Sequence, residues 1–428
     1  MAESYQKAYE STNTDILGIV IAMDDGRKFT MDGKDVISIY FIEDIFSHSI
    51  TGKIEFLDMY GFQEFAPFTG EEQIILVYGE DNNLLTFDIW KMSSSEQTNP
   101  TEPTAERLIT LFFVDTMFKK LIIPRYSRSW ENDTKGTEII EHLFKNMIEI
   151  ENYNIEPSST ELDFVMPYWN CMDSIRWILP RLRSITNESG YVFFNNTKSV
   201  FSTNVITLNK LFGTSTEVGK IDYSLEAVGP NPGATPDEGM QNKDFKIFDW
   251  KMEGIDHVST KGLQGGTSHG YDFMRKKLLS EDYTYSTMLE KTTLLGRQGL
   301  FSDISNEYGA FDIYAENDEE IIKNIAYSEW LQRYSRQQSL MVIVAGSVKR
   351  YAGMQIEMRW PSSSKDEIFD SNLRGRYLIK SVTHMFKFDS NIPYRQKLIL
   401  LKNGYESSRK KGLVGGSKKN VGDKTLIK

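Results

Sequence analysis

The sequence predicts a mixed α+β protein dominated by β-structure, with two small antiparallel β-barrel domains and an inserted helix-containing domain. Three observations lead to this prediction. Short alternating or β-branched segments bounded by turn residues occupy both ends of the chain, amphipathic helical patterns lie between them, and 428 residues suffice for two to four domains. With 40% hydrophobic and 12% aromatic residues, each domain can bury a core that needs no disulfide.

The first part of the chain is expected to form strands. Segments such as 52–57 alternate polar and apolar residues, as a half-buried strand does, and Asp24-Asp25-Gly26 supplies a turn. Residues 93–106 are polar and contain Pro100 and Pro103, which predicts an exposed loop. The expected strands are 16–21, 36–42, 52–57, 74–78, 84–90 and 107–113.

The next part changes to a helical period. Residues 137–150 place Ile139, Leu143 and Met147 on one stripe, which predicts an amphipathic helix. A second helix is expected to begin at Asn170, with Asp173 three residues later as in a capping box. Pro180 should kink or shorten it, and Gly190 precedes a strand at 191–194.

The last part returns to strands around a third helix. Residues 213–240 read as a Gly- and Pro-rich loop, and residues 259–270 as a second flexible stretch. A helix is predicted at 316–338, where Glu316, Asp318, Glu319 and Glu320 favour the positive end of the helix dipole. The remaining expected strands are 244–252, 340–345, 354–360, 377–388 and 395–402.

Charge is unevenly distributed along the chain. The net charge is −11, but Glu406–Lys428 carries seven basic and two acidic residues, a net +5 that leaves −16 for the rest. An acidic chain is a poor candidate for wrapping nucleic acid. The Gly-rich tail should be disordered alone in water, and two interpretations remain open for it: a solvated tail, or an arm that orders on an acidic partner.

The sequence contains no motif that convincingly predicts a catalytic or metal-binding site. Cys171 is the single cysteine, so disulfides and Cys-based zinc sites are excluded, and we expect a small buried hydrophobe. The stretch Gly266-Thr267-Ser268-His269-Gly270 fits G-x-S-x-G, but a Gly-rich loop precedes it where a strand is required. We therefore nominate no catalytic, cofactor-binding or metal-binding residue, and we expect no cofactor. The histidines form no metal-binding spacing, with His142 expected at a helix surface or boundary and His384 facing inward from a strand; the five are His48, His142, His257, His269 and His384.

Two further features concern location. The chain has no run of about 18 apolar residues, so no membrane insertion is expected. Its first residues lack the pattern of a signal peptide, which predicts synthesis in a cytoplasm-like compartment.

Two stretches resemble the baseplate central hub proteins of contractile-tailed bacteriophages, which are related to the base of the type VI secretion spike. The first is Phe164–Trp169, followed by the helix at 170–185 and the strand Gly190–Phe194. The second is Gly353–Met358, then Gly375–Phe386 and Tyr394–Leu401, which is similar to a Gly-x-Tyr-x-Val-x-x-Val-x-His pattern in the closing strands of that family. The resemblance covers roughly residues 15–405; the 213–240 loop and the basic tail have no counterpart.

The resemblance implies a structural protein of the phage virion, made in the host cytoplasm and built into the tail baseplate. Such hubs are homotrimers in which each subunit contributes two tube-like barrels, giving a pseudo-sixfold ring. One side meets the hexameric tail tube protein and the other a trimeric central spike protein, which in some relatives has a lysozyme domain on a separate chain. The tape measure protein and the baseplate wedge proteins are further implied partners, and DNA passes through the channel at genome ejection without specific binding. If acidic residues line that channel, DNA phosphates would be repelled from its wall.

The order of the predicted elements and this resemblance together give the expected domains. They are a first tube-like barrel at 1–115, a helix-containing middle domain at 116–205 continued at about 265–335, a second tube-like barrel split between 206–264 and 336–405, and a basic flexible tail at 406–428.

Two alternatives belong to other functional classes. One is a tail-associated cell-wall hydrolase that uses Ser268 or paired acids. The other is a different β-rich binding module, such as the hub of a non-contractile tail tip or a secretion-system spike base.

Overall fold

The computed structural model describes most of the chain between residues 16 and 402. The described residues are 16–31, 35–58, 61, 68–78, 83–97, 106–131, 133–198, 202–213, 218–221, 247–253, 266–272, 275–283, 310–314, 318–335, 338–358, 373, 375–388 and 394–402. The basic tail and His257 lie outside them.

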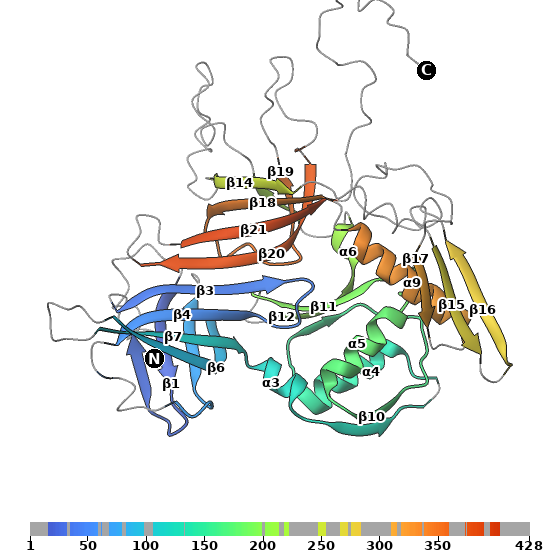
Figure 1. Ribbon diagram of the computed structural model, residues 1–428, viewed down its shortest axis with the longest axis horizontal. Helices are drawn as coiled ribbons and strands as arrows, with labels where there is room; N and C mark the ends of the chain where they lie inside the picture. Colours follow the sequence, from blue (N-terminus) through green and yellow to red (C-terminus); the bar gives the residue numbers. More distant parts are fainter. Residues whose placement is uncertain are drawn as a thin grey trace, which may run out of the picture.

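Thirteen strands of the described residues form one curled, almost wholly antiparallel sheet, seen as the long stack of arrows in Figure 1. Its order is β14-β18-β21-β20-β3-β4-β7-β6-β5-β1-β2, with β19 and β13 added beside β20. The mixed, β-dominated class is therefore confirmed. The strands are β1 (Ile16–Ala22), β2 (Lys28–Met31), β3 (Val36–Asp44), β4 (Thr51–Asp58), β5 (Gln73–Tyr78), β6 (Asn83–Gln97), β7 (Glu106–Asp115), β13 (Val218–Ile221), β14 (Ile247–Glu253), β18 (Gln338–Ala345), β19 (Gln355–Met358), β20 (Gly375–Lys387) and β21 (Tyr394–Lys402).

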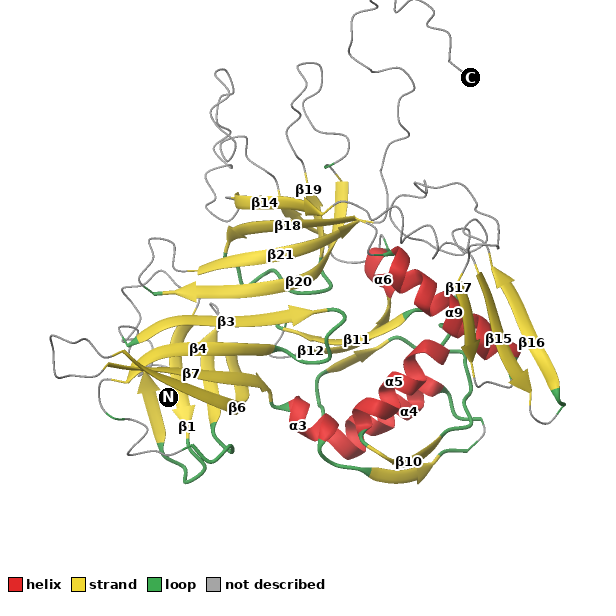
Figure 2. Cartoon of the chain, in the orientation of Figure 1, coloured by secondary structure: helices red, strands yellow, loops and turns green. Residues whose placement is uncertain are grey.

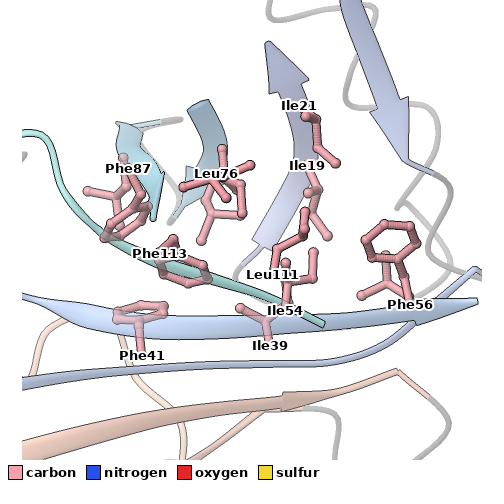
Figure 3. Packing of buried hydrophobic residues seen from close by; sticks show 14 of the residues in the cluster. Ile19, Ile21, Ile39, Phe41, Ile54, Phe56, Leu76, Phe87, Leu111 and Phe113 are labelled. Atoms are coloured by element: carbon pink, nitrogen blue, oxygen red, sulfur yellow. The ribbon is translucent and has the colours of Figure 1, made fainter. Parts of the chain in front are cut away.

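Two hydrophobic cores lie against this sheet, one in each half. In the N-terminal half, side chains from β1, β3, β4, β5, β6 and β7 point toward one another, as Figure 3 shows. In the C-terminal half, alternate residues of β18, β19, β20 and β21 build the second core around Tyr377. Alternation with period two explains both, because every second side chain of a strand faces the same side of the sheet.

A helical lobe is inserted between the two halves, with α4, α5 and β10 placed apart from the main sheet in Figure 2. Asn170 caps α5 by accepting a hydrogen bond from the backbone N–H of Asp173 at 2.7 Å, as its position predicts. The helix ends at Ile178, and Pro180 lies in the short 3-10 turn that follows, as expected. The elements are α3 (Met117–Ile122), β8 (Tyr126–Ser129), α4 (Gly136–Leu143), η1 (Phe144–Ile148), β9 (Tyr153–Ile155), β10 (Val165–Trp169), α5 (Cys171–Ile178), η2 (Leu179–Arg181), β11 (Tyr191–Asn196), β12 (Ser202–Thr207) and α6 (Leu208–Phe212).

A third group joins the lobe to the sheet. The helix α9 (Glu319–Tyr334) begins with the expected acids, and its Trp330 and Leu331 pack with Phe194 of β11 and Leu378 of β20. It contacts a small sheet made of β15 (Gly266–Asp272), β16 (Lys277–Tyr283) and β17 (Ala310–Tyr314). None of the helices in the described part of the chain has the length and hydropathy needed to cross a lipid bilayer.

Four local expectations need correction. Residues 93–97 continue β6 and are no loop, because their backbone pairs with β7 although the side chains are polar. Residues 266–270 are strand, since their backbone pairs with both β16 and β17, and Val218–Ile221 is a strand that pairs with β19. The helix expected at 137–150 starts at Gly136 and becomes a π-helix from Phe144. The rest of the expected loops, 98–105, 214–217, 222–240 and 259–265, lies outside the described residues.

The core of the N-terminal half depends on a close approach at Gly52. A Cβ atom at this position would lie 2.5 Å from the ring of the buried Phe113 on β7. We expect Gly52→Ala to lower the free energy of unfolding by about 1–3 kcal/mol, because the aromatic ring would have to shift within a packed core. Urea unfolding measures the effect, with Thr110→Ala on the solvent face of β7 as control; equal stability of the two variants would contradict it.

Candidate functional site

The N-terminal and C-terminal halves share one sheet because β20 pairs with β3. The antiparallel register runs from Ser381 opposite Asp44 to Lys387 opposite Ser38. This ladder brings one side of both halves into one surface, while the two hydrophobic cores cover the other side. One end of that surface is covered by α9, where Leu378 and Leu401 are buried in a third core. Any function of that surface depends on how the ladder is held.

A buried hydrogen-bond relay holds the ladder from its core side. His384 Nε2 lies 2.8 Å from Glu43 Oε1, and His384 Nδ1 lies 2.8 Å from the Tyr394 hydroxyl. The imidazole also stacks on Phe41, with ring centroids 4.2 Å apart. His384 and Glu43 are both fully buried, so the inward position expected for His384 is confirmed.

The partners further along fix the direction of the relay. The Gln396 amide Nε2 donates to the Tyr394 hydroxyl at 2.9 Å, and its Oε1 accepts from Arg350 Nη1 at 2.9 Å. With Gln396 as donor, the Tyr394 hydroxyl donates to His384 Nδ1, and His384 donates from Nε2 to Glu43. A chain of donors thus runs from Arg350 to a carboxylate, each member partnered as a buried polar group requires.

The same carboxylate ties in the helical lobe. Glu43 accepts hydrogen bonds from the backbone N–H and the hydroxyl of Thr197, both at 3.0 Å. Thr197 follows β11, and Asn196 beside it donates to the carbonyl of Ala352 at 2.9 Å. One side chain of β3 therefore connects the two halves of the sheet and the lobe.

The solvent side of the continuous sheet carries a row of three cationic and three apolar or aromatic side chains. We call this row the cation–aromatic rung. Each member is the register partner of the next, across β21, β20, β3, β4, β7 and β6. At about 4.8 Å per strand, the five steps span about 24 Å. In order, the members of the rung are Arg395, Met385, Tyr40, Lys53, Phe112 and Lys91.

Each cation of the rung lies over the face of an aromatic ring. Lys53 Nζ is 5.3 Å from the centroid of Tyr40, Lys91 Nζ is 5.6 Å from that of Phe112, and the Arg395 guanidinium is 4.8 Å from that of Phe248. These distances are those of cation–π contacts, which keep each charge close to the sheet.

The neighbouring rows extend this surface, which we call the basic face. Lys397 lies between Ile343 and Thr383, Lys387 is opposite Ser38, and Lys251 on β14 is opposite Met341. Among the described residues, the acidic side chains on this side include Glu55, which bonds Lys53, and Asp44, which is paired with Lys380. The cations of the basic face are Lys53, Lys91, Lys251, Lys387, Arg395 and Lys397.

A second buried carboxylate marks the joint between β7 and the helical lobe. Asp115 accepts from the backbone N–H groups of Ile50 and Phe118 at 2.7 and 3.0 Å, and from the Asn195 amide at 3.1 Å. Burial raises the pKa of Asp115 to about 6, and the nearby Asp88 acts in the same direction, while the three hydrogen bonds oppose the rise. Beside it lies a cavity of about 340 Å³ that is also lined by Lys120.

The histidines do not come together in the described part of the chain. His48 stacks on Phe193, and burial, followed by the charge of Arg176, lowers its pKa. His142 is half-buried with Trp130 edge-on to its ring, which confirms the boundary position. His269 lies on β15, where it pairs in register with Ser280. Among the described residues, no three His, Cys, Asp or Glu side chains are grouped as a metal ion would need.

The nucleophile candidates lie in structural positions. Ser268 is in the middle strand of a three-stranded sheet, where its buried hydroxyl has no hydrogen-bond partner among the described residues, so no base there activates it. Cys171 is buried at the start of α5, as expected, and burial raises the pKa of its thiol to about 12.

Sequence reasoning missed the basic face. Its cations come from five strands that are far apart in the sequence, and most of these strands carry both signs of charge. The available signal was the alternation of Arg395, Lys397 and Ile399 against the buried residues of β21, which indicates a cationic face on that one strand.

Comparisons with known proteins give a consistent fold. No protein-family model matches the chain, and no curated protein matches it. Among solved structures, it is similar to a tail protein from Neisseria meningitidis MC58, with a TM-score of 0.55, 10% sequence identity, and coverage of 90% of this chain and 96% of that one. It is also similar to the 43 kDa tail protein of prophage MuSo2 from Shewanella oneidensis, with a TM-score of 0.57, 10% identity, and coverage of 90% and 98%. The chain has the fold of these tail proteins, which confirms the fold that the sequence resemblance implied.

Removing the shared carboxylate should loosen all three parts. We expect Glu43→Ala to lower the free energy of unfolding by about 3 kcal/mol, because it leaves His384 and the Thr197 N–H buried without an acceptor. Chemical denaturation measures this. Glu55→Ala, on the solvent side of β4, is the control and should cost less than about 1 kcal/mol. A Glu43→Ala cost as small as that of the control would contradict the role given to the relay.

Asp115 should make stability depend on pH. Its pKa is higher in the folded protein than the ordinary 3.8, so its stabilising contribution is complete below about pH 4 and is lost as the pH rises through about 6. A rise of this size corresponds to about 3 kcal/mol. The difference in free energy of unfolding between wild type and Asp115→Asn should therefore shift by most of that amount, about 2.4 kcal/mol, in favour of the variant, between pH 4 and pH 7. Parallel pH profiles from denaturant titrations would show that Asp115 does not titrate in this way.

Proposed function

We propose that this chain is a structural hub of a phage tail baseplate, a homotrimer that adapts a hexameric tail tube to a trimeric central spike. The proposal rests on the continuous sheet. It gives one subunit two antiparallel halves whose corresponding sides lie on the same side of one sheet. The fold it shares with two tail proteins, one of them from a prophage, supports a role in the same kind of assembly.

Symmetry gives the physical reason for such a subunit. A threefold partner and a sixfold partner can be joined by a trimer when each protomer offers two comparable surfaces. The two halves of this chain, held in one sheet by the β20–β3 ladder, would offer two such surfaces at a fixed spacing. A ring of three chains then presents six positions to a tube and three to a spike.

The ends of the sheet supply contacts for a ring. β14 lies at one end of the strand order and β2 at the other. Trp250 and Met252 of β14 point to the core side, opposite Val342 and Leu340, yet they are 46% and 36% exposed. An edge strand with exposed apolar side chains favours a neighbouring chain, which would pair with it and cover them.

In this ring we place the basic face toward the channel, since it is the surface that both halves share. The channel wall would then carry cations where acidic residues were expected, and DNA in transit would pass a wall of mixed apolar and positive character. The tail tube, central spike, tape measure and wedge proteins are the partners that this role implies, in the tail of the virion. The same symmetry argument applies to the two alternative roles, the hub of a non-contractile tail tip and a secretion-system spike base.

The native mass of the purified protein tests the proposal. Three copies of the 49.3 kDa chain give about 148 kDa. We expect this mass for the protein alone, or a complex containing three copies of it when the trimeric spike component is added. We expect a smaller mass for Trp250→Lys, because a charge at the exposed edge opposes strand pairing.

Leu278→Lys is the matched control, because Leu278 is also exposed but lies on β16, away from the main sheet. Light scattering should show the same mass for this variant as for wild type. If the wild-type protein is a monomer both alone and with the spike component, the trimer is contradicted. If Trp250→Lys is still a trimer, the contact at the exposed edge is contradicted.

A further inference from the structure

We propose that the basic face binds an acidic, amphipathic polypeptide segment lying across the strands. The inference concerns a binding partner and stands apart from the number of subunits, so its test and the native-mass test can fail independently.

The sign of charge is the first argument. The chain carries a net charge of −11, but the basic face gathers six cations. Glu55 bonds Lys53 and is also near the charge of Lys387, Asp44 is paired with Lys380, and Asp249 lies beside Lys251 on the same side. The register partners of Lys397, Lys387 and Lys251 are uncharged, so cations outnumber these acids on the face. A locally positive surface on an acidic protein selects an anionic partner.

The apolar content of the face decides between classes of anion. Ile42 is 42% exposed between Thr51 and Thr383, and Tyr40, Met385, Ile343 and Ile399 are half-buried on the same side. A duplex offers phosphates to the cations but leaves these apolar side chains uncovered. An amphipathic segment with acidic residues covers both, so the composition favours a polypeptide.

Shape gives the third argument. The cations lie over aromatic rings at 4.8 to 5.6 Å, which restrains the charges close to the sheet. Lys53 and Lys91 are two strands apart, or about 10 Å, close to the rise of seven helical residues. The whole rung of about 24 Å matches about 16 residues of α-helix. A helix with acids one heptad apart therefore matches the spacing of Lys53 and Lys91, while Arg395, three strands from Lys53, is about 14 Å away, or nine to ten helical residues.

Fluorescence anisotropy with a labelled peptide tests the proposal. The probe is a 21-residue helix of three identical heptads, with Glu and Leu on one face. A scrambled peptide of equal composition and a 20-base-pair duplex are the comparison ligands. We expect the amphipathic peptide to bind the full-length protein at least about tenfold more tightly than either of these at physiological salt.

Variants locate the binding on the face. Lys91→Glu and Lys397→Glu should each weaken peptide binding about tenfold, and Ile42→Ser should weaken it without changing any affinity for the duplex. Lys28→Glu makes the same charge change on β2, away from the basic face, and should leave the affinity unchanged. Thermal melts confirm that each variant is folded.

Three outcomes would overturn the proposal. The amphipathic peptide could bind no better than its scrambled form. The duplex could bind as tightly as the peptide, with Ile42→Ser silent, which would assign the face to nucleic acid. Lys28→Glu could weaken binding as much as Lys397→Glu, which would make the attraction a property of overall charge.

Discussion

The hydrogen bond between His384 and Glu43 is the interaction on which the rest of the architecture depends. It joins residues 341 positions apart and lies at the centre of the ladder that makes one sheet of the N-terminal and C-terminal strands. Closing so long a loop costs entropy, which grows slowly with length and must be offset by what the contact buries. Here the offset comes from the stacked rings of Phe41 and His384 and from the cores on either side.

The relay also sets the position of the helical lobe. Thr197 donates twice to Glu43, so the end of β11 is held at the same point as the ladder. Asp115 and Asn195 make a second buried link, between the ends of β7 and β11. Two links a short distance apart restrain both the place and the orientation of the lobe, and each uses a buried carboxylate that is satisfied by donors from elements far apart in the sequence.

The sequence carries the local structure well and the long-range structure poorly. Alternation predicts β3, β20 and β21, and Asn170 with Pro180 predicts the ends of α5, because these signals lie within a few residues. Ser93, Ser94 and Ser95 form strand only because β7 pairs with them, and Gly266–Gly270 does so only between β16 and β17. The inward position of His384 is predictable from its strand. Its partner Glu43 is not, since nothing local distinguishes it from the other acids, and the basic face is missed for the same reason.

The register of the β20–β3 ladder links the buried polar relay to the exposed basic face. In a ladder, a shift by one residue moves every side chain to the opposite face. A shift of β20 against β3 would turn Met385 into the core and Phe386 out to solvent, and a shift of β3 against β20 would do the same to Tyr40 and Phe41. Apolar packing alone opposes this weakly, since both sets contain large apolar side chains. Glu43 and His384 oppose it strongly. With Glu43 turned outward, His384 Nε2 and the Thr197 N–H would be buried without this acceptor; with His384 turned outward, the Tyr394 hydroxyl would lose its acceptor and Glu43 would keep only the bonds from Thr197. The relay therefore specifies which side of the sheet becomes core and which becomes the basic face.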